Sequence, residues 1–393
     1  MGRKVVIIGG GYGGASAAKA LDQDADVVLV EPKDAFVQNA VSLRALVRPE
    51  WADNLFIPYD RLLQRGRVLR ERAISVDAGG VLLGSGERLD ADYLVLATGS
   101  GYPFPFKFDT DRSGQARERL LTLHAGLAAA TRVLITGAGP VGLELAGEIK
   151  AVWPDKHVTV VDPAPELLPR FAPQLREDLR RQLDALGVDL RLGTALGAQP
   201  PVEPGRAEPF TVPLTGPLTG PSTRPSTGRI TGPSTGPSTG EEISADIWFR
   251  AHGVTVHTGY LGADLVTART PEGLVRVGDR LNVHGFDHVY AIGDITDLPE
   301  AKMAGNAMSH AEVVAANILA QVRNEQPTSV YRPSEVPFVL LPLGPEGGVG
   351  QLPSPDGPIV LSGETVSEYK GADLFTGRFA ELFGTDTRRP EAA

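Results

Sequence analysis

The chain has no cysteine among its 393 residues. Structural disulfides, iron–sulfur ligation by thiolates and a redox-active protein dithiol are therefore excluded. Positive charge is also scarce, because 38 Lys and Arg residues face 48 Asp and Glu residues, for a formal net charge of −10. Since phosphate binding needs a basic face, we do not expect nucleic acid as the main partner.

Long apolar runs are missing as well. No stretch approaches the roughly 18 apolar residues of a membrane-spanning helix, so we expect no membrane span. The first apolar run, residues 5–8, is too short for the core of a signal peptide. We therefore predict a cytoplasmic protein, with peripheral contact at the inner face of the membrane left open. The seven histidines show no metal-ligand spacing, and no metal site is predicted.

The first 31 residues carry the strongest motif. A short β-branched run is followed by Gly9, Gly11 and Gly14 in G-x-G-x-x-G spacing, a helical pattern and a second apolar run that ends at Glu31. Glycine at these positions permits a tight turn, close approach of a pyrophosphate and close helix–strand packing. A carboxylate at the second strand end can accept ribose hydroxyls. The stretch predicts dinucleotide binding rather than a glycine-rich turn in an unrelated α/β protein.

The same pattern recurs in the middle of the chain. An apolar run at 133–135 precedes Gly137, Gly139 and Gly142, and a later run at 158–161 ends at Asp162. Two fingerprints indicate an internal repeat. We predict an α/β fold with two Rossmann-like dinucleotide-binding domains, each a three-layer ββα arrangement with a β-meander, plus a C-terminal α+β region.

Shorter signals fill in the plan. Strands are predicted at 68–76 and 81–83, at 92–98 ending in Thr98-Gly99, and at 288–294 ending in Gly293-Asp294. A linker is predicted at 103–108, and a helix is predicted over 301–322, beginning near residues 302–304. Residues 213–240 form seven tetrapeptides of the P-S-T-G kind. Because proline at nearly every fourth position blocks helix and sheet, we predict a disordered insertion at the tip of a hairpin between strands near 210–212 and 243–249. A docking site is the alternative.

Apolar residues near the C-terminus share one helical face: Leu374, Phe375, Phe379, Leu382 and Phe383. This stripe predicts peripheral membrane contact through residues 372–385. The competing interpretations are packing against the body of the protein or against the mate in a homodimer.

Together these motifs resemble the pyridine nucleotide-disulfide oxidoreductase superfamily over nearly all of residues 1–385. Within it, the chain resembles the ferroptosis-suppressor, or apoptosis-inducing-factor-like mitochondrion-associated, quinone reductases and the related type II NADH dehydrogenases. Four segments carry this closer likeness: 39–46 (NAVSLRAL), 97–108 (ATGSGYPFPFKF), 141–150 (VGLELAGEIK) and 370–375 (KGADLF).

The resemblance implies FAD on the first motif and NAD(P)H on the second. The residues it implies for FAD are Gly9, Gly11, Tyr12, Gly13, Gly14, Glu31, Arg44, Ala97, Thr98, Gly99, Gly293, Asp294, Lys302, Met303 and Ala304. Those for NAD are Gly137, Gly139, Gly142 and Asp162. A carboxylate at position 162 repels a 2′-phosphate, so NADH is expected over NADPH. Tyr12 and Met303 belong to types that more commonly pack than react.

The implied domains are 1–110 and 254–325 for FAD, 111–253 for NAD(H) with the 213–240 insertion, and 326–393 at the C-terminus. The catalytic residues implied are Glu144, at the nicotinamide–flavin contact, and Lys370, near the flavin and quinone. An ion pair between them would govern proton supply. The plainer alternatives are a first-turn acid favoured by the helix dipole and a solvated lysine.

The leading interpretation is a FAD-dependent NADH:quinone oxidoreductase. Because there is no protein dithiol, the acceptor must meet the flavin directly. Two alternatives remain: a reductase of a ferredoxin-like carrier, which a basic face around Arg44, Arg48 and Arg61 would favour, and a slowly turning-over flavin-bearing signalling module.

Overall fold

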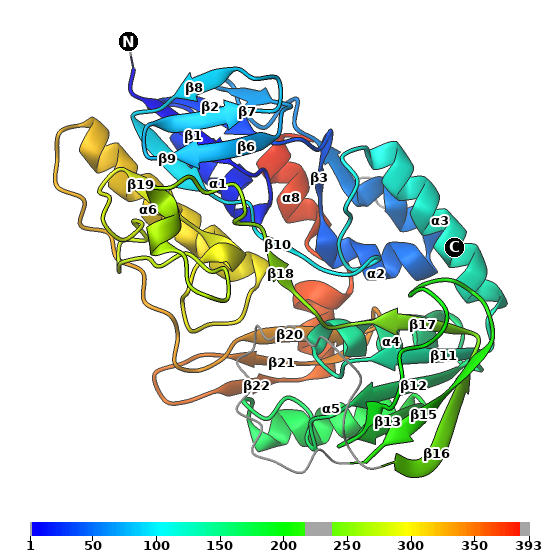
Figure 1. Ribbon diagram of the computed structural model, residues 1–393. Helices are drawn as coiled ribbons and strands as arrows, with labels where there is room; N and C mark the ends of the chain where they lie inside the picture. The colour runs from blue at the N-terminus through cyan, green and yellow to red at the C-terminus, as the bar shows by residue number, and fades with distance from the viewer. Residues whose placement is uncertain (1, 217–237, 386–393) are drawn as a thin grey trace.

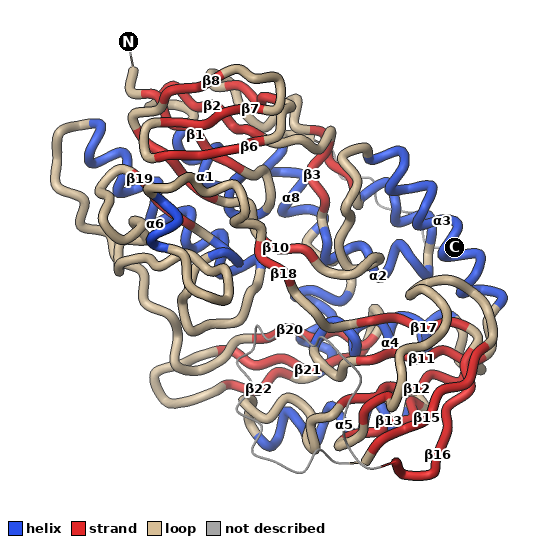
Figure 2. The backbone as a smooth tube through the Cα atoms, viewed as in Figure 1, coloured by secondary structure: helices blue, strands red, loops and turns tan. Residues whose placement is uncertain are grey.

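The computed structural model describes residues 2–216 and 238–385. Its strands form two parallel sheets, which Figure 2 shows as separate groups, and several small antiparallel sheets. Most of the predicted 213–240 insertion, residues 217–237, lies outside the described residues.

The first parallel sheet is the frame of the N-terminal unit, in the order β19-β9-β1-β2-β5 (Figure 1). The strands are β1 (Lys4–Ile8), β2 (Asp26–Val30), β5 (Arg67–Leu69), β9 (Tyr93–Leu96) and β19 (Val289–Ala291). Ile8, Leu96 and Ala291 stand in register at their carboxyl ends. The loops after these three strands therefore meet at one edge of the sheet, although β1 and β19 lie far apart in the chain.

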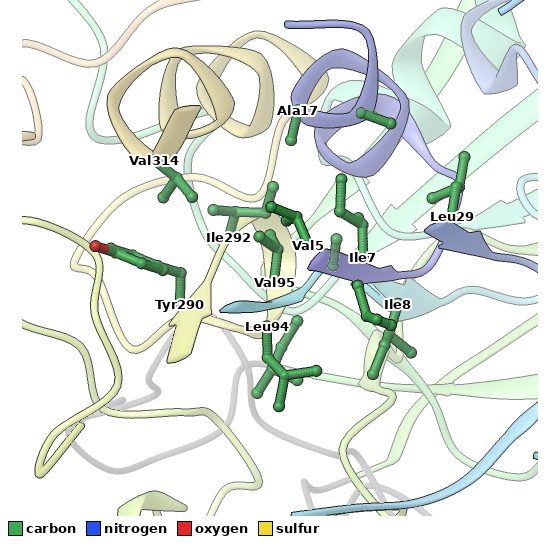
Figure 3. Packing of buried hydrophobic residues seen from close by; sticks show 14 of the residues in the cluster. Val5, Ile7, Ile8, Ala17, Leu29, Leu94, Val95, Tyr290, Ile292 and Val314 are labelled. Carbon is green, nitrogen blue, oxygen red and sulfur yellow. The ribbon is translucent and has the colours of Figure 1, made fainter. Parts of the chain in front are cut away.

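Both faces of this sheet are covered. Helices α1 (Tyr12–Leu21) and α6 (Ala304–Val322) share one face, and Figure 3 shows Ala17 and Val314 on the same side of Val5 and Val95. The antiparallel meander of β6 (Ala73–Asp77), β7 (Gly80–Leu83) and β8 (Arg88–Asp90) contributes to the same core. Burial on both faces explains the continuous β-branched runs in the sequence.

The second parallel sheet repeats the design in the order β13-β12-β11-β17. Its strands are β11 (Arg132–Thr136), β12 (His157–Asp162), β13 (Val188–Leu192) and β17 (Ile247–Arg250), with helices α4 (Pro140–Val152) and α5 (Pro173–Ala185). A smaller antiparallel sheet consists of β14 (Ala195–Leu196), β15 (Phe210–Thr215) and β16 (Ser238–Ala245). The β15–β16 pairing confirms the predicted hairpin. The two-unit α/β prediction is confirmed as well.

Several predicted boundaries were wrong. The strand expected at 243–249 is two strands in different sheets, separated at Asp246, whose carboxylate accepts from Arg132 in a two-pronged ion pair. Strand β15 continues through Pro213 into the repeat, with a register irregularity between Pro213 and Thr215 that accommodates the proline. The strand expected to end at Gly293-Asp294 ends at Ala291. The helix expected to begin near residues 302–304 does begin at Ala304.

Connecting elements join the two units. Strand β10 (Ser100–Gly101) pairs antiparallel with β18 (Thr255–Val256), so both crossings between the units run side by side. The remaining elements here are β3 (Ala35–Val37), α2 (Asn39–Val47), η1 (Pro49–Asn54), β4 (Phe56–Pro58), α3 (Ser113–Ala129), η2 (Leu265–Ala268) and η3 (Gly293–Ile295). The predicted linker at 103–108 contains no strand.

The C-terminal region contacts both units, its sheet packing on α4 and α5 and its last helix on the first unit. Its elements are β20 (Val339–Leu343), β21 (Gly347–Leu352), β22 (Ile359–Leu361), α7 (Gly363–Val366), a π-helical turn η4 (Ser367–Gly371) and α8 (Thr376–Phe383). Among the described residues, no helix combines the length and apolarity needed to cross a membrane.

The apolar stripe at α8 packs against the body of the protein. Phe379 and Phe383 are 3% and 0% exposed, and both rings contact Phe36. Leu374, which precedes the helix, is also buried. Phe375 and Leu382 of the stripe are partly exposed, and peripheral membrane contact through residues 372–385 stays a prediction. The amphipathic pattern reflects packing on the N-terminal unit, which was the competing interpretation.

Candidate active site

The first glycine turn lies at the carboxyl edge of the first sheet, where dinucleotides bind in such folds. Gly9 has φ +103°, and a Cβ on it would lie 2.4 Å from Ala97 O. A Cβ on Gly14 would lie 1.8 Å from Gly9 O, whereas one on Gly13 would meet Ala307 O at 3.0 Å. These glycines are thus needed by the fold itself, because β1, α1 and α6 approach too closely for a side chain.

Gly11 is different, and its surroundings fit a diphosphate. A Cβ there would meet nothing within 4 Å. Gly11 is also the N-cap of α1, and the helix begins with no side-chain cap and no acidic residue in its first turn. Free N–H groups and the positive helix end therefore face open space, which suits a bound anion.

In the second glycine turn, one glycine is again needed for packing and another borders open space. A Cβ on Gly142 would lie 2.1 Å from Gly137 O, so Gly142 serves packing. Gly139 caps α4, and a Cβ on it would meet nothing within 4 Å. No acid or side-chain cap occupies the first turn of α4. Both motifs thus offer an open, uncapped helix start.

The two strand-end carboxylates are bound alike. Glu31 accepts the N–H of Gly10 at 2.6 Å and that of Lys33 at 2.9 Å. Asp162 accepts the N–H of Ala138 and that of Ala164, each at 2.7 Å. Burial raises the pKa of Glu31, although both N–H groups favour its charged form. Each carboxylate therefore ties its glycine turn to the loop that follows the next strand.

Asp294 lies near the first motif with partners that the sequence did not reveal. Its Oδ2 accepts the Ser100 hydroxyl at 2.5 Å and lies 3.1 Å from Lys107 Nζ, which also donates to Ser100 O. Burial would raise the pKa of Asp294, but Lys107 and Ser100 outweigh it and hold that pKa below its ordinary value. The advance signal was the resemblance segment 97–108, which contains both Ser100 and Lys107.

Other predicted FAD residues gather at the same edge. Thr98 Oγ1 donates to His257 O, and Gly99 has φ +64° with open space around it. Met303 is the N-cap of α6, which lacks a side-chain cap, while Lys302 Nζ turns back to Thr296 O at 2.6 Å. Ala304 opens the helix. The start of α6 is thus another exposed positive helix end.

Tyr12 is a packing residue, as its type suggests. Its ring meets Phe36 and Phe379 edge-on, each at 5.1 Å between centroids. Nearby, two buried side-chain oxygens, Gln38 Oε1 and Asn39 Oδ1, have no hydrogen-bond partner among the described residues. Buried acceptors of this kind call for a donor, which a bound cofactor can provide.

Arg44 does not reach the glycine turn. It is 1% exposed, and its guanidinium grips Glu148 of α4 with Nη2 to Oε1 at 2.7 Å. Its Nη1 donates to Gly371 O at 2.5 Å. Its hydrogen-bond partners are protein acceptors between α2, α4 and η4, so FAD contact by Arg44 stays a prediction without support from these contacts. Burial also removes it from the basic docking face expected around positions 44, 48 and 61.

Glu144 and Lys370 meet in an ion pair. Lys370 Nζ lies 2.6 Å from Glu144 Oε1 and donates to Leu340 O at 3.0 Å. Each charged side chain is only 14% exposed. Burial raises the pKa of Glu144, while Lys370 opposes the rise. Glu144 stands in the second turn of α4, which begins at Pro140, so it is not the first-turn acid of the plainer alternative.

Close packing brings the pair together. A Cβ on Gly147 of α4 would lie 2.5 Å from Leu343 Cα of β20, and one on Gly371 would lie 2.9 Å from Pro345 O. The two glycines thus let α4, β20 and η4 touch at the backbone. Lys370 then reaches Glu144 across a chain separation of 226 residues.

Comparisons with known proteins agree with this geometry. Residues 3–203 match the family model described as pyridine nucleotide-disulphide oxidoreductase. Ferroptosis suppressor protein 1 of Taeniopygia guttata is 31% identical over 358 residues, which cover 89% of this chain and 88% of the relative.

Solved structures share the fold at lower identity. The sulfide:quinone oxidoreductase of Aquifex aeolicus superposes with a TM-score of 0.75 at 18% identity, over 98% of this chain and 92% of that one. NDH2 of Plasmodium falciparum, solved in complex with NADH, gives a TM-score of 0.67 at 13% identity, over 98% and 95%.

Proposed function

Because the chain belongs to the pyridine nucleotide-disulphide oxidoreductase family, we propose that it is a FAD-dependent NADH:quinone oxidoreductase. The observation that carries the proposal is the Glu144–Lys370 ion pair, in which Glu144 lies on the helix of the second glycine motif. The chain has no cysteine that could form a redox-active dithiol. The names of two structural neighbours support the acceptor and the donor, since one is a quinone oxidoreductase and the other binds NADH.

FAD would be held by the first unit and NAD(H) by the second. Gly11 and the N-terminus of α1 would face the FAD diphosphate, Glu31 its ribose and Asp294 its ribityl chain; Gly139 and the N-terminus of α4 would face the NAD diphosphate. When bound, FAD supplies two-electron transfer from the nicotinamide to the acceptor.

The proton balance of the reaction gives the Glu144–Lys370 ion pair a role as a proton donor. NADH gives two electrons and one proton as hydride, whereas a quinone becomes a quinol by taking up two electrons and two protons. One proton must therefore come from solvent or from the protein. A carboxyl of raised pKa beside an ammonium, with both groups at the edge of solvent, can hold and pass that proton at Glu144 Oε1 and Lys370 Nζ.

We infer NADH as the preferred donor. Asp162 ends β12 and its oxygens also bind the N–H groups of Ala138 and Ala164, so its charge is fixed close to the second glycine turn. A carboxylate in this place accepts ribose hydroxyls and repels a 2′-phosphate.

The alternatives receive less support. A ferredoxin-like partner was expected on a basic face that included Arg44, and that residue is buried. No observation favours the signalling module.

The test is an acceptor assay. The FAD-loaded protein is mixed with NADH and with menadione, a soluble ubiquinone, a ferredoxin or dioxygen, and NADH oxidation is followed by absorbance. The proposal expects turnover with quinones to exceed that with the other two acceptors by at least about tenfold. Faster turnover with ferredoxin would replace it with the carrier-reductase function.

A further inference from the structure

A buried ion pair next to the proposed catalytic pair has no role in the chemistry described so far. Arg44 and Glu148 are 1% and 3% exposed, and the guanidinium contacts both carboxylate oxygens through Nε at 3.2 Å and Oε1 through Nη2 at 2.7 Å. Desolvating two charges costs so much that such a pair is weak evidence for stability. We therefore expect the Arg44–Glu148 pair to serve a purpose other than stability.

Arg44 binds the backbone next to Lys370. Its Nη1 donates to Gly371 O at 2.5 Å and to Ala372 O at 3.3 Å. Gln38, from the same part of the chain, donates to Leu374 O at 2.7 Å. The N-terminal unit thus holds the segment immediately after Lys370 at three carbonyl oxygens.

Glu148 connects that contact to Glu144. The two glutamates stand four residues apart on α4, so their side chains share one face of the helix. Each has its own cation: Lys370 for Glu144 and Arg44 for Glu148. Lys370, Glu148 and Arg44 all act electrostatically on the pKa of Glu144. The Arg44 guanidinium therefore binds Glu148 of α4 through Nε and Nη2, and it binds the backbone just after Lys370 through Nη1.

We propose that Arg44 is a positioning residue for the Glu144–Lys370 pair: by joining Glu148 to the carbonyl oxygens of Gly371 and Ala372, it fixes the backbone that presents the Lys370 ammonium to Glu144. This inference rests on the proposed function. It requires arginine in particular, because only a planar fork can serve a carboxylate and a carbonyl in different directions, whereas lysine offers a single point charge.

The test is a double-mutant cycle on the FAD-loaded protein. The variants are Lys370→Met, Arg44→Met, Arg44→Lys and the double Arg44→Met/Lys370→Met, each assayed for kcat with a soluble quinone between pH 5 and 10. We expect Lys370→Met and Arg44→Met each to lower kcat on the order of tenfold or more. The double variant should be no slower than Lys370→Met by more than about threefold, because residues that act through one another are non-additive.

Two features of this design separate a direct electrostatic effect of Arg44 on Glu144 from an effect of Arg44 on the backbone that presents Lys370. A direct electrostatic effect of Arg44 on Glu144 would persist without Lys370, so the double variant would then be slower still, by the product of the two losses. Arg44→Lys keeps the charge but not the fork, and we expect it to be slowed nearly as much as Arg44→Met. A multiplicative double variant, or full activity in Arg44→Lys, overturns the inference.

A matched control addresses general structural damage. Arg132 forms a two-pronged pair with Asp246 away from this site, although its side chain is 43% exposed and that of Arg44 is buried. Arg132→Met should lower thermal stability yet leave kcat and its pH profile unchanged.

If Arg44→Met does not fold, the kcat values of Arg44→Lys and Glu148→Gln test the positioning role instead, since both substitutions keep the side-chain volume. If Lys370→Met itself leaves kcat and its pH profile unaltered, the proposed function of the pair fails, whereas an effect of Lys370→Met without one of Arg44 sinks only the positioning role.

Discussion

Lys370 Nζ lies 2.6 Å from Glu144 Oε1, and the pair connects the C-terminal segment to the helix of the second glycine motif. Burial raises the pKa of Glu144 and Lys370 lowers it. In Lys370→Met, the largest influence that opposes burial is lost, and the pKa of Glu144 rises further. The pH at which kcat responds to loss of the Glu144 proton should then move upward, and Glu144→Gln should lack that response.

The measurement is kcat with a soluble quinone as a function of pH in the three proteins. A downward displacement in Lys370→Met, or an unchanged profile in Glu144→Gln, would contradict the assignment of this proton to Glu144.

The first glycine motif separates cofactor binding from folding. Gly11→Ala places a methyl group in open space, so the protein should fold normally and bind FAD at least about tenfold more weakly. Gly14→Ala drives a methyl group against Gly9 O and should destabilise the protein by about 1–3 kcal/mol or more.

Flavin absorbance after purification and thermal unfolding of the apoprotein report the two effects. Gly114→Ala, also in open space but on α3, is the matched control and should retain full FAD content. Normal FAD affinity in Gly11→Ala would show that the diphosphate does not approach this turn.

Asp162 is expected to set the choice of nicotinamide. Asp162→Asn removes the charge that repels a 2′-phosphate, and it keeps an acceptor oxygen for only one of the two N–H groups, those of Ala138 and Ala164, which Asp162 binds with separate oxygens. The ratio of kcat/KM for NADH over NADPH should fall by about tenfold, equivalent to about 1.4 kcal/mol. An unchanged ratio, with both values reduced alike, would mean that Asp162 only supports the turn.

The terminal helix should contribute stability through its buried ring. Phe383→Ala empties a fully buried site against Phe36 and Tyr59, at a cost of about 3–5 kcal/mol in the free energy of unfolding. Ile359→Ala, at a site 49% exposed, should change that free energy by no more than about 0.5 kcal/mol. Equal small effects in chemical denaturation would argue against the packed position of α8.

Local sequence was sufficient for some features and insufficient for others. The glycine turns and the strands before them follow from short-range rules, because β-branched runs buried on both faces and G-x-G-x-x-G spacing are self-contained signals. The amphipathic stripe of α8 was visible too, yet periodicity does not state what covers an apolar face. Asp246 marked the boundary between two strands, but only the partner Arg132 makes that boundary apparent.

The partners of charged residues were beyond sequence reasoning. The contacts of Arg44 with Glu148 and of Asp294 with Lys107 join residues 104 and 187 positions apart. Such pairs depend on how whole elements pack, so no local pattern specifies them. The Glu144–Lys370 pair was anticipated only because a family resemblance supplied it.

The central claim, electron transfer from NADH through bound FAD to a quinone, is tested most directly by two anaerobic mixing steps. The FAD-loaded protein is first mixed with one equivalent of NADH, and then with menadione, while the flavin absorbance is recorded. We predict rapid bleaching in the first step and complete, equally rapid recovery in the second. A flavin that bleaches but is not reoxidised by quinone, or a long-lived complex with NADH that never bleaches, would contradict this account.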